Sequence, residues 1–240
     1  MILPRRYIYI VITYILMHFS SLLAIPFILN LDESQLVTFS VYWQVMAFLV
    51  AFIIMLIFLR TEMKEFFALE NKRIWNIILW SFLGFFLAMI AQMIAVLIQT
   101  FVLGIRPGSE NTLEIMAMAR QVPILIIVIT IVGPILEELV FRKAIFGTLY
   151  KKMNFFFAGL LSSFIFALVH MDFNHILVYT AVGFVFAFLY IETKRIIVPI
   201  LAHAGMNTFA VIVQLSQDPE KIEEQLRLLE QLQSIIIGGF

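Results

Sequence analysis

The chain has 240 residues, of which 62% are hydrophobic and only 13% are charged. Soluble domains are about 45 to 50% apolar and about 25% charged, so this composition argues strongly against a soluble globular fold. The net charge is zero, which gives no indication of nucleic acid as a partner, and the absence of cysteine excludes a thiolate nucleophile, a disulfide and a thiolate metal site.

Seven segments are apolar over about the 20 residues that a membrane-spanning helix needs. They are residues 7–29, 41–59, 75–102, 122–149, 155–171, 174–191 and 196–214. We therefore predict an all-α, polytopic transmembrane bundle of about seven spans, with the active site inside the bundle. The number ranges from six to eight because the linker 60–74 could lie along the interface and the 103–121 loop could re-enter the membrane.

Lys and Arg are distributed unevenly between the two sides of these spans. With a cytoplasmic N-terminus, twelve of the 16 basic residues lie on the inner side, as the excess of Lys and Arg in cytoplasmic loops predicts. They are Arg5, Arg6, Arg60, Lys64, Lys72, Arg73, Arg142, Lys143, Lys151, Lys152, Lys194 and Arg195. We therefore expect a multi-pass membrane protein with its N-terminus in the cytoplasm. A bacterial cell membrane is the location that the general impression of the chain suggests. Seven spans would place the C-terminus outside.

The C-terminal tail has the signature of a helix start. Asp218 is a suitable N-cap, and Pro219 and Glu220 follow it in the first turn. Apolar residues then recur on one helical face. The pattern favours a surface helix or a helix that contacts another copy of the chain.

The fourth apolar segment contains two adjacent glutamates, Glu137 and Glu138, shortly after Pro134. A charge in the hydrocarbon costs at least about 2.5 kcal/mol on insertion scales, so intramembrane carboxylates indicate function. Glu138 and Arg142 are four residues apart and can pair on one helical face. Glu137 points about 100° away and has no such partner along the helix, which makes it the better general base. The alternative is that both glutamates pair with basic residues at the membrane edge.

Three further polar residues lie in or at the end of apolar segments. His203 and Asn207 are four residues apart, so they present an imidazole and an amide on one face, a pair suited to stabilising an oxyanion or to hydrogen bonding between helices. His170 lies at the end of the fifth segment, and its role there is either structural or catalytic. His175 is expected at the interface, and His18 is expected to be structural.

Three short motifs together resemble those of the CPBP family of intramembrane endopeptidases. They are EELVFR at 137–142, FALVH at 166–170 and HAGMN at 203–207. The family includes the Rce1-type CAAX proteases and bacterial relatives linked to bacteriocin processing or self-immunity. The resemblance covers residues 120–214, whereas the N-terminal part of the chain adds only hydrophobic spans.

The resemblance implies a role for each matching residue. Glu137 would activate water with help from His170, while His203 and Asn207 would bind the tetrahedral oxyanion. The implied reaction is peptide-bond hydrolysis without an acyl-enzyme, on a peptide or membrane-protein substrate in the lipid bilayer.

Glu138 and Arg142 would be the supporting acid and base of the first motif. On this basis the chain divides into N-terminal helices and interfacial loops (1–121), a CPBP-like catalytic core (122–214) and an amphipathic C-terminal segment (215–240). Two other functions stay open: a non-catalytic membrane scaffold or immunity factor, and a proton-coupled transporter that uses the same buried groups.

A metal is a further question at this site. Glu137, His170 and His203 form a possible zinc set, since two histidines and one carboxylate occur in catalytic zinc sites. Asn207 favours a metal-free water attack, because an amide is a better donor than zinc ligand. We therefore expect no obligatory cofactor, with zinc as the alternative.

Helix counting raises one difficulty. At 1.5 Å per residue, Glu137, His170 and His203 lie about 18, 22 and 10 Å from the predicted inner ends of their helices. Straight, upright helices would keep these side chains apart. Tilt, a break at Pro134 or misplaced boundaries would each remove the discrepancy.

Overall fold

The computed structural model describes residues 4–60, 71–105, 108–216 and 228 of the chain. In these ranges all regular structure is helical. In chain order the elements are α1 (Arg5–Phe19), η1 (Ser20–Ala24), α2 (Ile25–Ile28), α3 (Glu33–Phe58), α5 (Asn71–Phe101), α6 (Glu110–Gln121), α7 (Leu125–Ile127), η2 (Val128–Val132), α8 (Gly133–Glu137), η3 (Glu138–Phe146), α9 (Gly147–Leu149), α10 (Phe155–Val169), η4 (Phe173–His175), α11 (Ile176–Thr193) and α12 (Ile197–Ser216).

The prediction of a polytopic helical bundle is confirmed. Five helical stretches in the described residues are long and apolar enough to cross a membrane: Arg5–Ile28, Ser34–Phe58, Ile74–Phe101, Phe173–Thr193 and Ile197–Ser216. The other two predicted spans are also helical. Helix α10 is apolar but has only 15 residues, and the segment 125–149 carries the charged residues of the first motif.

Helix α3 begins eight residues before the predicted start of the second span, at Glu33 rather than at residue 41. Asp32 and Gln35 form a capping box, in which the Asp32 carboxylate accepts from the Gln35 backbone N–H at 2.8 Å and the Gln35 side chain accepts from the Asp32 N–H at 3.3 Å. These hydrogen bonds satisfy free backbone donors at the helix start. The helix therefore extends into polar sequence that hydropathy alone does not include.

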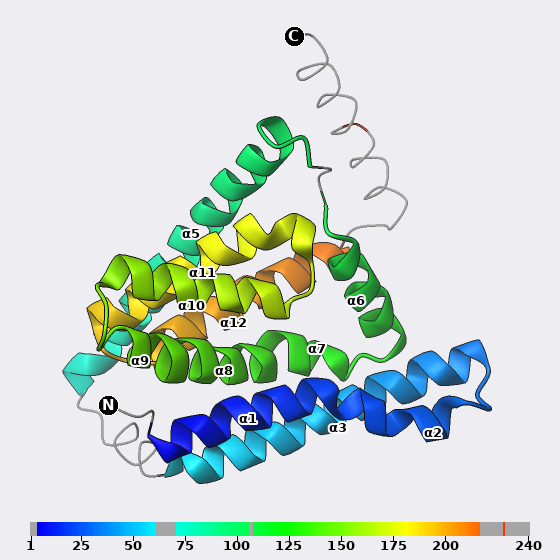
Figure 1. Ribbon diagram of the computed structural model, residues 1–240. Helices are drawn as coiled ribbons and strands as arrows, with labels where there is room; N and C mark the ends of the chain where they lie inside the picture. Colours follow the sequence, from blue (N-terminus) through cyan, green and yellow to red (C-terminus); the bar gives the residue numbers. More distant parts are fainter. Residues whose placement is uncertain (1–3, 61–70, 106–107, 217–227, 229–240) are drawn as a thin grey trace.

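The helices are arranged around the segment that carries the two glutamates (Figure 1). Helices α1 and α3 pack side by side against one flank of that segment, and α10 packs against η3. Helix α11 lies between α10 and α5, and α12 contacts α5, α11 and η2. A buried cluster that includes Tyr14, Met55, Leu136, Phe141 and Phe166 joins α1, α3, the glutamate segment and α10. The glutamates are thus enclosed by helices from both halves of the chain.

Three sequence expectations concern the connections and the tail. In the 103–121 region the described residues include α6, an amphipathic helix whose N-cap Ser109 accepts from the Thr112 N–H at 3.2 Å. Most of the 60–74 linker and nearly all of the 215–240 segment lie outside the described residues, so the predicted interfacial linker and C-terminal helix stay predictions.

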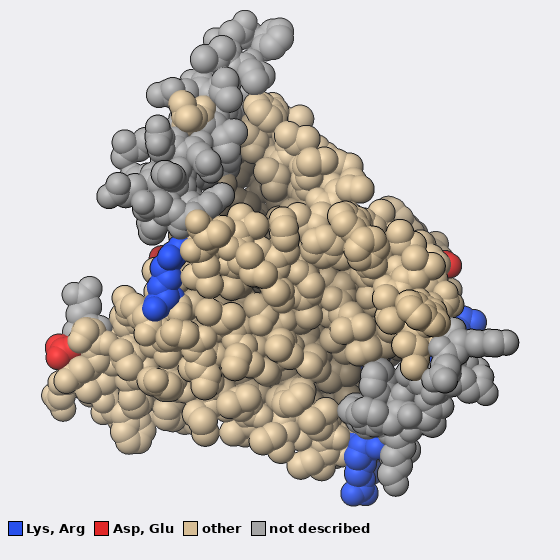
Figure 2. Space-filling model, turned by 180° about the vertical axis from the view of Figure 1, so that it is seen from behind, with Lys and Arg blue, Asp and Glu red and all other residues tan. Residues whose placement is uncertain are grey.

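The surface of the bundle is apolar over a broad face. Figure 2 shows almost no charged side chains there, and the few that are visible lie toward the left and right of the view. Large apolar side chains on α5 point outward, with Trp75 74% exposed and Phe82 61% exposed. A surface of this kind is unfavourable in water and suits lipid.

Candidate active site

The two glutamates lie on an irregular helix. The Gly133 N–H donates to the Val128 carbonyl, and the Gly147 N–H donates to the Arg142 carbonyl, each five residues back as in a π-helix. Pro134 lies in the first turn of α8, between the two π-helical segments η2 and η3. The sequence predicted a kink at Pro134; the structure has wide turns on both sides of it. Such turns are frequent at functional sites because they redirect neighbouring side chains.

Glu138 is fully buried and has two partners on opposite sides of its carboxylate. One oxygen, Oε1, lies 2.9 Å from Nδ1 of His203, and the other, Oε2, lies 3.2 Å from Nε of Arg142. The pairing of Glu138 with Arg142 that their spacing predicts is confirmed. Because a buried carboxylate is costly unless it is paired, these two contacts account for its presence here.

Arg142 is itself fully buried, and three groups hold its guanidinium. Its Nη2 donates to the Gly183 carbonyl at 3.1 Å. Its Cζ lies 4.5 Å above the ring centroid of Phe166 and 5.4 Å from that of Phe186, both within cation–π range. A Cβ added at Gly183 would lie 3.1 Å from Nη2 of Arg142, so this position needs glycine for the close approach.

Glu137 faces the same histidine from the other side. Its Oε2 lies 3.5 Å from Nε2 of His203, and its side chain is 16% exposed, whereas that of Glu138 is 0% exposed. Of the two adjacent carboxylates, only Glu137 has an exposed part. Its partner, His203, lies on α12, and the sequence around Glu137 does not reveal this contact.

His203 is therefore held between two carboxylates. A carboxylate only accepts, so Nδ1 at 2.9 Å from Glu138 carries a proton. The contact from Nε2 to Glu137 is longer, at 3.5 Å, and is an ion-pair distance rather than a good hydrogen bond. The ring of Phe186 stacks on the imidazole with centroids 4.7 Å apart and fixes its plane.

His170 lies at the C-terminal cap of α10 and has a defined orientation. Its Nδ1 donates to the Phe166 carbonyl at 2.8 Å, which leaves Nε2 as an acceptor. Its ring packs edge-on against Phe166, with centroids 4.5 Å apart, and stacks on Tyr179 at 4.2 Å. Phe166 is also 6.1 Å from the His203 ring, so it is the shared neighbour of the two histidines.

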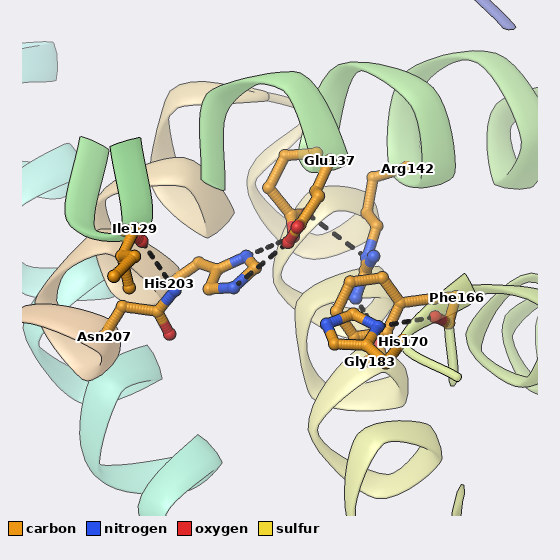
Figure 3. A network of polar contacts seen from close by, with 9 residues as sticks. Ile129, Glu137, Arg142, Phe166, His170, Gly183, His203 and Asn207 are labelled. Carbon is orange, nitrogen blue, oxygen red and sulfur yellow. Dashed lines mark hydrogen bonds and ion pairs between the residues drawn. The ribbon is translucent and has the colours of Figure 1, made fainter. Parts of the chain in front are cut away.

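Asn207 lies one turn after His203 on α12, but its amide is already engaged. Its Nδ2 donates to the Ile129 carbonyl of η2 at 3.0 Å, a carbonyl close to the π-helical turn (Figure 3). The alternative that Asn207 makes a hydrogen bond between helices thus describes its contact in this structure. Its second N–H and its carbonyl oxygen have no such partner among the described residues.

Comparison with known proteins places the chain in a family. Residues 119–209, which include all six motif residues, match the model of the Rce1-like type II CAAX prenyl endopeptidases. The chain is 48% identical to "Putative membrane peptidase YdiL" of Bacillus subtilis over 98% of both chains. It is 40% identical to membrane-embedded CAAX protease MroQ of Staphylococcus aureus over 89% of this chain and 90% of that protein.

This chain belongs to the Rce1-like CAAX endopeptidase family. A third relative, UPF0177 protein YxdF of Lactococcus lactis, is 36% identical over 37% of this chain and 50% of its own length. No solved structure matched significantly. The chain is accordingly an integral membrane peptidase that acts on a peptide or membrane-protein substrate.

The arrangement does not present an evident metal site. A metal in this Rce1-like protein would need Glu137, His170 and His203 to converge, yet the described residues contain no group of three His, Asp or Glu side chains placed to hold an ion. Glu137 and Nε2 of His203 lie 3.5 Å apart, but His170 does not complete a group of three with them. The residues as arranged do not fit the zinc set considered from the sequence.

The discrepancy in helix counting has a clear resolution. The glutamate segment ends at Leu149 and α12 begins at Ile197, within one residue of the expected ends. The boundaries are thus not at fault, yet Glu137 and His203 lie 3.5 Å apart. The assumption of upright helices that start at one depth is wrong, and the irregular turns around Pro134 contribute to the difference.

Several neighbours of the site escaped the sequence analysis. Gly183 and Phe186 on α11 and Tyr179 on the same helix contact the motif residues, but a glycine or an aromatic residue in an apolar span carries no signal by itself. The N-terminal part also does more than add spans. Tyr14 of α1 packs edge-on against Phe141 at 5.5 Å, and His18 packs against Tyr14 at 4.6 Å.

Proposed function

We propose that this membrane peptidase is an intramembrane endopeptidase in which Glu137 activates the water that attacks a peptide carbonyl. The observation that carries the proposal is the position of His203 between the two carboxylates, with Nδ1 bound to buried Glu138 and Nε2 3.5 Å from the more accessible Glu137. A base and a hydrogen-bond donor thus lie next to each other inside the bundle, as attack on a carbonyl requires.

His203 would provide the main stabilisation of the oxyanion. Because Nε2 makes only a long contact with Glu137, an N–H at this position remains available to the carbonyl oxygen of the substrate. Asn207 would supply a second donor through the other hydrogen of its amide, or by exchanging the Ile129 carbonyl for the oxyanion. These are the roles that the motif resemblance implies for the two residues.

Glu138 and Arg142 would act through His203 rather than on the substrate. Both are fully buried, and Glu138 joins Nε of Arg142 to Nδ1 of His203. A carboxylate in this position fixes the orientation of an imidazole and stabilises its protonated form, as in other catalytic constellations. His170, with Nε2 left as an acceptor, would assist Glu137 in orienting the water.

The reaction would proceed by direct hydrolysis. Glu137 takes one proton from water while the oxygen forms a bond to the carbonyl carbon, and the carbonyl oxygen becomes the oxyanion bound by His203. The proton held by Glu137 then passes to the amide nitrogen as the C–N bond breaks, giving a carboxylic acid and an amine. No covalent intermediate with the protein forms.

The setting of the reaction is a further part of the proposal. The distribution of Lys and Arg supports a cytoplasmic N-terminus in a bacterial cell membrane. The core at 122–214 would carry the chemistry, the helices within 1–121 would enclose it, and the segment 215–240 is a candidate contact between copies. The name of the Staphylococcus aureus relative suggests a CAAX peptide as one substrate class to test.

The test begins with wild type and the Glu137→Ala variant purified in detergent. Each is incubated with a library of peptides and membrane-protein segments, and new termini are identified by mass spectrometry. We expect cleavage products with wild type only. Equal products from both proteins would contradict the role of Glu137. A scaffold or a proton-coupled transporter predicts no products from either protein. A scaffold further predicts that cellular function is retained when Glu137, His170 and His203 are all replaced by alanine, whereas a transporter that uses these buried groups predicts that it is lost.

A further inference from the structure

A second polar cluster lies where α10 turns into α11, immediately after His170. Asp172 is its centre: one carboxylate oxygen accepts from the Ser109 hydroxyl at 2.7 Å, and the other lies 2.9 Å from Nδ1 of His175. Burial raises the pKa of Asp172, but the hydrogen bonds from Ser109 and His175 outweigh it and hold the pKa below its usual value. The charged carboxylate thus ties the α10–α11 turn to the start of α6.

The chain is sharply bent at this turn. Met171, directly after His170, has a φ of 55°, in the left-handed region that residues other than glycine seldom adopt. The side chain of Gln99 at the end of α5 donates to the Asn174 carbonyl in the same turn. The backbone around His170 is therefore fixed by contacts from α5 and from the start of α6.

Tyr179 connects this cluster to the histidine. It lies one turn into α11, and its ring stacks on His170 with centroids 4.2 Å apart and an interplanar angle of 29°. Its hydroxyl interacts electrostatically with the side chains of Asn111 and Ser109 near the start of α6. The tyrosine thus packs on the imidazole through its apolar ring and has its polar end toward α6.

The orientation of His170 depends on these contacts from both faces. The Phe166 carbonyl accepts from Nδ1, and the Phe166 ring packs edge-on against the imidazole. The hydrogen bond from Nδ1 defines the tautomer, in which Nε2 is the free acceptor. Rotation of the ring about its bond to Cβ would break that hydrogen bond, and stacking against Tyr179 restricts the rotation further.

We infer that Tyr179 is a positioning residue for His170, which it holds by stacking, with its hydroxyl toward the start of α6. The catalytic role of His170 rests on the proposed function, whereas the contact between Tyr179 and His170 does not. It also gives α6 a role beyond the family motifs, because Arg120 near the end of that helix donates to the Gln214 carbonyl of α12 at 2.7 Å. Helix α6 thereby links the surroundings of His170 to the helix that carries His203.

The test uses nuclear magnetic resonance of the full chain in detergent micelles with ¹⁵N-labelled histidine. The chain has 4 histidines, so the imidazole signals can be assigned by single replacements, with His170→Asn identifying the relevant pair. In wild type we expect His170 to show a protonated Nδ1 and an unprotonated Nε2. In Tyr179→Leu the two nitrogen signals of His170 should move toward each other, as interconverting tautomers require, while those of His203 stay in place.

Two further variants complete the design. Tyr42→Leu is the matched control, because Tyr42 is 53% exposed on α3 and should leave the His170 signals unchanged. If Tyr179→Leu does not fold, Tyr179→Phe decides the question, since loss of the hydroxyl should shift the His170 signals more than Tyr42→Phe does. Unchanged His170 signals in the folded Tyr179 variants would overturn the inference.

Kinetics separate this inference from the proposed function. With a peptide cleaved by wild type, Tyr179→Phe should lower kcat at least about 5-fold and leave KM within about 2-fold, since a misplaced catalytic group affects the chemical step more than binding. A changed KM with an unchanged kcat would contradict a positioning role. If Glu137 proves dispensable for cleavage, the proposed function fails, while the signals of His170 still decide whether Tyr179 orients it.

Discussion

Glu138 and His203 are joined by a contact of 2.9 Å between Oε1 and Nδ1, although 65 residues separate them in the chain. The first and third motifs therefore meet at a fully buried carboxylate. In the proposed mechanism this contact gives the two adjacent glutamates different tasks. Glu138 would orient the histidine, and Glu137, which is partly exposed, would activate water.

Replacing Glu138 by glutamine should damage both stability and activity. The amide keeps an oxygen for Nδ1 of His203 but leaves Arg142 as a buried charge without its counter-ion. Breaking a buried pair of this kind typically costs about 3 to 5 kcal/mol. Unfolding in mixed detergents should show a loss of this order, and cleavage should be lost with it. A variant as stable as wild type would show that the pair is not what stabilises this part of the bundle.

Gly183→Ala should destabilise the protein by about 1 to 3 kcal/mol, the usual range for overpacking. The new Cβ would lie 3.0 Å from Cβ of Ser163 and 3.1 Å from Nη2 of Arg142, so the guanidinium would have to shift. Gly205→Ala is the matched control, since its nearest neighbour would be Cδ2 of Phe85 at an ordinary 3.6 Å. Thermal unfolding of the two variants compares them directly, and equal losses would contradict the close approach at Gly183.

Asn207→Ala should lower kcat by about 100- to 1,000-fold with little change in KM, as removal of one oxyanion donor does in other hydrolases. Peptide kinetics measure both constants. If the amide only fastens α12 to the Ile129 carbonyl, the variant should instead lose stability and keep its turnover per folded molecule. That second result would remove Asn207 from the chemistry.

Strong chelators should leave cleavage unchanged. Glu137 and His203 lie close together, but the described residues contain no third His, Asp or Glu placed with them to hold an ion. The measurement is peptide cleavage after dialysis against a chelator, with metal content determined on the same sample. Loss of activity that zinc restores would contradict the metal-free mechanism and would require His170 to join Glu137 and Nε2 of His203 around the ion.

Most of the fold follows from the sequence because membrane spans are encoded locally. A run of about 20 apolar residues marks a helix wherever it occurs, and the pairing of Glu138 with Arg142 follows from their spacing of four. The start of α3 was missed because hydropathy ignores the Asp32–Gln35 capping box. The π-helical turns around Pro134 were missed because a proline signals an interruption without specifying its form.

Which residues form the site was easier to predict than how they are arranged. The three motifs identified six residues, but they could not show that both glutamates face His203, since that depends on how α12 crosses the glutamate segment. The present partner of Asn207 is a backbone carbonyl, which no sequence pattern specifies. Gly183, Phe186 and Tyr179 support the site through shape and stacking, and such residues are indistinguishable from ordinary apolar packing in one sequence.

The most direct test of the central claim compares Glu137→Gln with Glu192→Gln. Both replace a glutamate by its neutral isostere, but Glu192 is exposed near the end of α11, away from the motif residues. With a peptide that wild type cleaves, we expect Glu192→Gln to retain the wild-type rate and Glu137→Gln to lose at least about 1,000-fold in kcat while remaining folded. Cleavage by Glu137→Gln at the rate of the control would show that Glu137 is not the base, and the mechanism proposed for this site would be wrong.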